Sequence, residues 1–81
     1  MKRWNGIGKE FDELENKIYE GEYLNGKMNG KIKIYYEGYL EYKGELLNGK
    51  RHGKGKEYYF GILIYDGYYL NGEKNGKGKK I

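Results

Sequence analysis

The chain has 81 residues, which fits one domain, and its 16 Lys and Arg against 12 Asp and Glu give a formal net charge of +4. With 37% hydrophobic and 35% charged residues, it offers little material for a thick globular core. It has no cysteine, no apolar run near the roughly 20 residues of a membrane-spanning helix and no signal peptide at its start. We therefore expect a cytoplasmic protein, free or held at the periphery of a membrane or the cytoskeleton.

The opening residues, 1–18, match the second half of a later unit. The segment GIGKEF at 6–11 corresponds to GKGKEY at 53–58. A tyrosine follows the first glycine of this segment after 13 residues here but after 12 in the later unit, so one extra residue lies between 12 and 17. Apolar residues at helical spacing (Phe11, Leu14, Ile18) would fit one helical turn, but the repeat context favours a strand followed by a widened turn.

The rest of the chain repeats with a period of 23 residues. Such a period indicates stacked units that share a continuous core. The sequence therefore predicts one repeat domain over 1–81: a half repeat (1–18), two repeats (19–41 and 42–64) and a truncated repeat (65–81). The identical columns are Tyr19, Tyr42 and Tyr65; Gly21, Gly44 and Gly67; Leu24, Leu47 and Leu70; Asn25, Asn48 and Asn71; Gly26, Gly49 and Gly72; and Gly30, Gly53 and Gly76.

Each unit has the pattern of a β-hairpin. Side chains alternate from Tyr42 to Leu47, Asn48-Gly49 is a strong turn signal, and a return strand opens at Gly53 and Gly55. His52 is then expected in the turn itself. One strand from the half repeat and two from each later unit predict about seven strands in an all-β, elongated, single-layer antiparallel sheet of tandem hairpins.

Alternation assigns the tyrosines to one face of this sheet. If Tyr59 pairs with Tyr42, Gly55 lies opposite Leu46 on that face, where a glycine lets a ring lie flat over bare backbone. A single layer leaves part of its aromatic strip open, so this strip is the predicted protein-binding face. Its residues are Tyr19, Tyr23, Leu40, Tyr42, Leu46, Leu63, Tyr65 and Tyr69.

The segments YEGEYLNGKMNG, YKGELLNGKRHGKG and YDGYYLNGEKNGKG closely resemble the MORN (membrane occupation and recognition nexus) repeat, and the resemblance covers essentially the whole chain. Two positions depart from it: Leu46 stands where the family has an aromatic residue, and Ile32 stands where it has the second glycine of Gly-x-Gly. The resemblance implies an elongated sheet of hairpins and a non-catalytic scaffold role, with acidic phospholipid binding proposed for some members.

Catalytic and cofactor chemistry find little support in the composition. The chain has no Ser, Thr or Cys nucleophile, and His52 is its single histidine. The acidic cluster Glu10, Asp12, Glu13 and Glu15 is better explained as a solvated loop than as a cation site, and the glycine string at 49–55 lacks the Gly-Lys-Ser/Thr ending of a phosphate loop. We expect no enzyme activity, no cofactor and no metal.

Positive charge collects in the second half of the chain. The segments 42–64 and 65–81 carry +3 and +2, against 0 for 1–18 and −1 for 19–41. A solubilising surface is one explanation; an anionic membrane, an acidic protein and, least favoured, a nucleic acid are the alternative partners. The candidate anionic-lipid strip is Lys50, Arg51, Lys54, Lys56, Lys74, Lys77, Lys79 and Lys80.

Three hypotheses for function follow. The first is a scaffold or adaptor that binds a protein partner, such as an amphipathic helix on the tyrosine strip, or another copy of itself. The second is a peripheral membrane module that uses the basic strip on acidic phospholipids. The third is a catalytically silent repeat segment of a larger protein.

Overall fold

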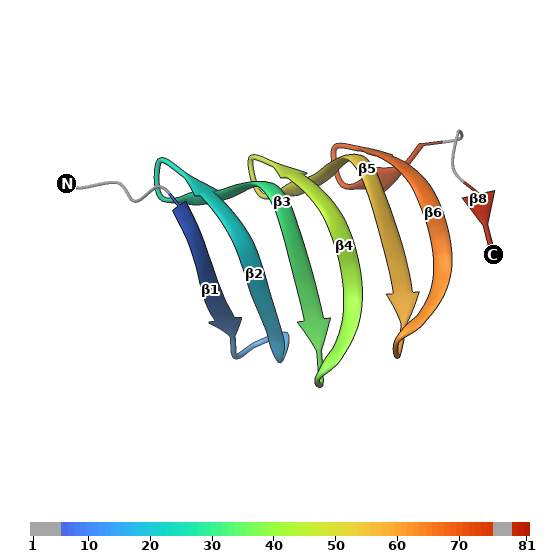
Figure 1. The fold of residues 1–81 in the computed structure, drawn as a ribbon, viewed down its shortest axis with the longest axis horizontal. Coiled ribbons are helices and arrows are strands. Elements are labelled where there is room, and N and C mark those ends of the chain that lie inside the picture. Colours follow the sequence, from blue (N-terminus) through green and yellow to red (C-terminus); the bar gives the residue numbers. More distant parts are fainter. Residues whose placement is uncertain (1–5, 76–78) are drawn as a thin grey trace.

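The computed structural model describes residues 6–75 and 79–81 of the chain. These residues form one antiparallel sheet (Figure 1). Its extents of 43 × 26 × 19 Å make it long and thin. The elongated single-layer sheet of hairpins predicted from the sequence is therefore confirmed. The strands are β1 (Gly6–Asp12), β2 (Lys17–Leu24), β3 (Lys27–Tyr36), β4 (Tyr39–Leu47), β5 (Lys50–Tyr59), β6 (Ile62–Leu70), β7 (Glu73–Lys74) and β8 (Lys79–Lys80).

The strands are hydrogen-bonded in chain order, from β1 to β7. The two-residue strands β7 and β8 both pair with β6, at Tyr69–Leu70 and at Tyr65–Asp66 respectively. Because β7 and β8 pair with different parts of β6, together they count as one strand next to it. The sheet is therefore seven strands wide, as expected.

The hairpin tips are two-residue turns whose residues both have positive φ. Asn48 and Gly49 have φ of 51° and 79°, and the equivalent pairs Asn25-Gly26 and Asn71-Gly72 have similar angles. These angles match the twist of the flanking strands. The first connection differs: residues 13–16 form a four-residue turn, in which the Asp12 carboxylate accepts hydrogen bonds from the backbone N–H groups of Leu14 and Glu15. The expected strand and widened turn are confirmed.

The register corrects two expectations from the sequence. Tyr42 lies opposite Glu57, and Gly44 opposite Gly55, rather than Tyr42 opposite Tyr59. The turn between β4 and β5 has two residues, so pairing resumes at Leu47 and Lys50. Near Gly53, which has φ of 71°, β5 then has two more residues than β4, and this bulge shifts the register. His52 therefore lies in β5 at this bulge and not in the turn. Figure 1 shows β3 and β5 changing direction in their first halves.

A second irregularity decides which leucines face the core. Two strands each contain one extra residue that has no cross-strand partner. On β4 this residue is Glu41, and on β6 it is Ile64. Leu40 and Leu63 pair with Tyr35 and Tyr58 and so lie on the face opposite Tyr42. They do not share the tyrosine face, as simple alternation predicted, because each bulge reverses the parity of its strand.

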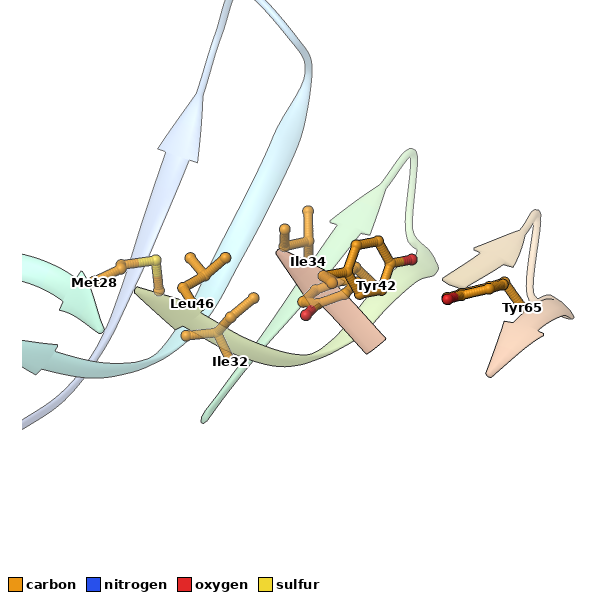
Figure 2. Packing of buried hydrophobic residues seen from close by; sticks show 7 residues of the cluster. Met28, Ile32, Ile34, Tyr42, Leu46 and Tyr65 are labelled. Atoms are coloured by element: carbon orange, nitrogen blue, oxygen red, sulfur yellow. The ribbon is translucent and has the colours of Figure 1, made fainter. Parts of the chain in front are cut away.

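The core is a single line of side chains on the tyrosine face (Figure 2). Tyr42 is fully buried, and its ring lies over the bare backbone of two glycines: a Cβ atom on Gly55 would lie 2.5 Å from the Tyr42 hydroxyl, and one on Gly44 2.7 Å from it. The expected stacking of a ring on mid-strand glycine is confirmed, although Tyr42 itself supplies the ring. The buried residues are Met28, Ile32, Ile34, Tyr42, Leu46, Tyr65 and Tyr69, with Tyr19 and Tyr23 packed against them.

Candidate functional site

The tyrosines of the second repeat and of the truncated repeat hold the hairpins together. The Tyr42 hydroxyl donates a hydrogen bond to the carbonyl of Glu45 (2.9 Å), and the Tyr65 hydroxyl donates in the same way to Tyr68 (2.9 Å). Tyr69 packs edge-on against both rings, with centroid distances of 5.3 and 5.4 Å. The contact between Tyr42 and Tyr69 crosses the boundary between two units, so the aromatic strip is the chain's own core in this region.

The first full unit uses its tyrosines differently, because Ile32 fills the space that a glycine leaves open elsewhere. A Cβ atom on Gly21 would lie 2.6 Å from the Ile32 side chain. The Tyr19 hydroxyl donates to the Glu15 carboxylate (3.0 Å), and the Tyr23 hydroxyl donates to Glu10. Part of the acidic cluster therefore accepts hydrogen bonds from tyrosine. The local change in packing follows from the departure at Ile32.

Burial raises the pKa of four tyrosines on this face. Burial, with the hydrogen bond to Glu15, raises the pKa of Tyr19 to about 12. Burial and the nearby Glu57 charge raise the pKa of Tyr69 to about 12. The pKa values of Tyr23 and Tyr42 are raised by the same main cause. The neutral phenol is thus the form that this packing requires.

Two cations of the predicted lipid strip belong to the tyrosine face. The Arg51 guanidinium lies 4.5 Å from the centroid of the Tyr42 ring and 3.5 Å from the carboxylate of Glu41, which also binds Lys17 (2.8 Å). The equivalent Lys74 pairs with Glu57 at 2.9 Å and lies 5.1 Å from the centroid of the Tyr65 ring. These cations cover aromatic rings, so they are not free to form a basic strip with the other lysines.

The opposite face of the sheet carries an open groove of about 1220 Å³. Side chains from all six long strands line it, and glycines from five of these strands contribute bare backbone. We call it the groove face. The charged residues of its lining are Lys9, Glu20, Lys31, Lys33, Lys43, Glu45, Lys54, Lys56 and Asp66.

A single cross-strand row of charged residues runs along this groove. From β1 to β6, each member lies directly opposite the next, and the signs read plus, minus, plus, plus, plus, minus. Three lysines of adjacent strands therefore follow one another without an intervening acid. We call this the charge row; its members are Lys9, Glu20, Lys33, Lys43, Lys56 and Asp66.

An apolar row lies beside the charge row, two residues further along each strand, or three on β4 and β6 where a bulge adds one residue. Phe11, Ile18, Tyr35 and Leu40 are successive cross-strand partners on β1 to β4, and Tyr58 pairs with Leu63 on β5 and β6. Phe11 is exposed and the others are half-buried. The groove face thus offers parallel charged and apolar stripes.

The predicted basic strip is divided by the structure. Lys54 and Lys56 line the groove, and Lys50 is exposed at a hairpin tip. Arg51 and Lys74 lie on the tyrosine face; Lys79 and Lys80 form β8, and Lys77 lies outside the described residues. The predicted strip omits Lys31, Lys33 and Lys43. Lys31 and Lys33 come from the segment 19–41, whose net charge is −1, and the strand register brings them beside Lys43, Lys54 and Lys56.

Other candidate chemistry has little geometric support. His52 is half-buried in β5 and takes part in none of the ion pairs within the described residues. Within residues 6–75 and 79–81, no group of three or more His, Cys, Asp or Glu gathers at metal-binding distances. The same described residues contain no helix long and apolar enough to cross a membrane.

The family model of the MORN repeat matches residues 19–31, 42–60 and 65–81, more than half of the chain. The chain therefore belongs to the MORN repeat family. MORN repeats are commonly protein- or membrane-interaction modules and are generally non-catalytic. A search of curated proteins finds no match to this chain.

Proposed function

We propose that this protein is a non-catalytic scaffold or adaptor that holds a protein partner on its groove face. The observation that supports this most is that one face of the sheet forms the buried core while the other face is open. Tyr42, Leu46, Tyr65 and Tyr69 are at most 6% exposed, whereas the groove face presents an open hollow with charged and apolar stripes. That the tyrosine strip itself binds a partner stays a prediction, and its burial leaves that partner little to contact.

A pull-down with the full chain tests this proposal. The groove variant carries Lys33→Glu and Lys56→Glu; the matched control carries Lys27→Glu and Lys50→Glu, exposed lysines of the same strands at the hairpin tips. Proteins retained by the wild type and the control but lost by the groove variant would support the proposal. Equal retention by both variants would contradict it.

Self-association is a second form of the same scaffold role. The outer edge of β1 has no neighbouring strand among the described residues, and its Ile7 and Phe11 are exposed. Such an edge can add a strand from another copy. Size-exclusion chromatography with light scattering would show a concentration-dependent dimer, and a strict monomer at high concentration would remove this form.

Acidic phospholipid is the alternative ligand, and the net charge of +4 and the groove lysines favour it. Each basic residue held near an anionic bilayer contributes about 1 kcal/mol. Co-sedimentation with phosphatidylserine vesicles should then fall with salt and with Lys54→Glu and Lys56→Glu. Binding that ignores lipid charge would exclude this alternative. A cytoplasmic location, at a membrane or cytoskeleton, is part of this proposal.

A further inference from the structure

The centre of the charge row has an unbalanced charge. Lys33 lies directly opposite Lys43, which lies directly opposite Lys56. Like charges opposite one another destabilise a sheet. None of the ion pairs within the described residues uses Lys33, Lys43 or Lys56. Glu20 and Asp66 lie opposite the two outer lysines, whereas Lys43 has a lysine on both sides. An arrangement that costs the free protein stability is explained if an external anion compensates it.

The spacing of the row selects the geometry of that anion. Adjacent strands lie about 4.8 Å apart, so the three lysines recur at this interval across the sheet. An α-helix rises about 1.5 Å per residue, and side chains three or four residues apart on one side recur about every 5 Å. A helix lying across the strands would therefore place successive carboxylates over successive lysines.

We propose, building on the binding role above, that the groove receives an acidic amphipathic α-helix of a partner protein, with its carboxylates on Lys33, Lys43 and Lys56. The apolar stripe of this helix contacts the apolar row, for example at Ile18 and Tyr35. The apolar row lies about 7 Å from the charge row along the strands. The six long strands span about 24 Å, which about 16 helical residues cover.

The acids that border the three lysines argue for a helix rather than a membrane. Glu20 on β2 and Asp66 on β6 lie in the same row and repel anionic head groups. A helix can satisfy them with a basic residue toward each end, whereas a lipid surface has no such pattern. A flat bilayer also has no shape that enters a groove lined by backbone glycines.

A designed, fluorescein-labelled helical peptide of about 16 residues provides the probe. It carries central glutamates spaced three or four residues apart, leucines on the adjoining stripe and a lysine toward each end. Fluorescence anisotropy with the full chain at low salt should show that Lys43→Glu weakens binding at least tenfold. A peptide with lysine in place of its middle glutamate should restore the affinity. Lys50→Glu, outside the groove, is the matched control and should change little.

Three results would overturn the inference: equal binding by wild type and Lys43→Glu, equal binding of a peptide with scrambled order, and no binding of the designed peptide at all. The proposed function is judged separately by the pull-down. A partner lost with the groove variant there, but without an acidic helix among its contacting segments, leaves the scaffold role standing and the acidic-helix inference rejected.

Discussion

At the scale of single residues, the covering of Tyr42 explains how a one-layer sheet buries an aromatic ring. Beneath the ring, Gly44 and Gly55 leave bare backbone, and above it the Arg51 guanidinium lies 4.5 Å from the centroid. Glu41 pairs with Arg51, so the covering cation is neutralised where it stands. The ring is enclosed by its own repeat and by Tyr69 of the next one.

Gly55→Ala should destabilise the protein by about 1–3 kcal/mol, the range of overpacked cores. The added Cβ would lie 2.5 Å from the Tyr42 hydroxyl, so the ring must move and its hydrogen bond to Glu45 is lost. Urea unfolding followed by circular dichroism measures the change. Gly38→Ala is the comparison: it has open space but φ of 83°, so it reports backbone strain alone. A Gly55→Ala variant as stable as wild type would contradict this packing.

The residue types were largely predictable, and their partners were not. Identical columns predicted glycines beneath tyrosine rings, and comparison with the family pattern identified Ile32 as the position where one of these glycines is replaced. Nothing in the sequence joins Arg51 to Tyr42 and Glu41, because the contact depends on two bulges whose positions hydrophobic alternation does not encode.

At the scale of elements, the hairpins were predictable because Asn-Gly turns carry a local signal. The bulges near Gly53, at Glu41 and at Ile64 shift the register without changing the pattern of residue types that predicts strands. This is why Leu40 and Leu63 were placed on the wrong face, and why the groove lysines of the first full unit were missed. Face assignment needed the hydrogen-bonded register, which a one-residue error reverses.

Lys43→Glu should raise the free energy of unfolding by a few tenths to about 1 kcal/mol. The new carboxylate would lie between Lys33 and Lys56, turning two like-charge pairs into two opposite-charge pairs. Urea midpoints at low and high salt measure the gain, which should shrink as salt screens it. Lys50→Glu controls for the change in net charge. A destabilised Lys43→Glu variant would mean that the three lysines already have compensating partners.

At the scale of the whole molecule, the core is one cluster shared by all hairpins rather than one core per hairpin. Met28 and Ile32 of the first full unit, Leu46 of the second and Tyr65 of the third belong to the same buried set (Figure 2). Each unit therefore depends on its neighbours for burial, as expected for stacked repeats. Conditions that weaken the packing of the buried tyrosines should therefore destabilise the entire sheet at once.

Alkaline pH is such a condition. The pKa of Tyr19 and of Tyr69 is raised to about 12 in the folded protein, from a usual value of 10.0. Between these values the unfolded chain releases phenolic protons that the folded chain retains. The unfolded state then binds fewer protons, so the free energy of unfolding falls as pH rises. This contribution is fully present below about pH 10 and is lost progressively from pH 10 through 12.

Urea unfolding at a series of pH values between 8 and 11.5 should show midpoints that are steady at first and then decline. Tyr69→Phe should decline less steeply, because it removes one of the raised groups; Tyr59→Phe, an exposed tyrosine, is the matched control. Lysine deprotonation is common to all three proteins and cancels in the comparison. Phenolate absorbance near 295 nm gives an independent measurement on the folded chain. If every tyrosine titrates near pH 10 before unfolding, the rings do not share the enclosed core that joins the repeats.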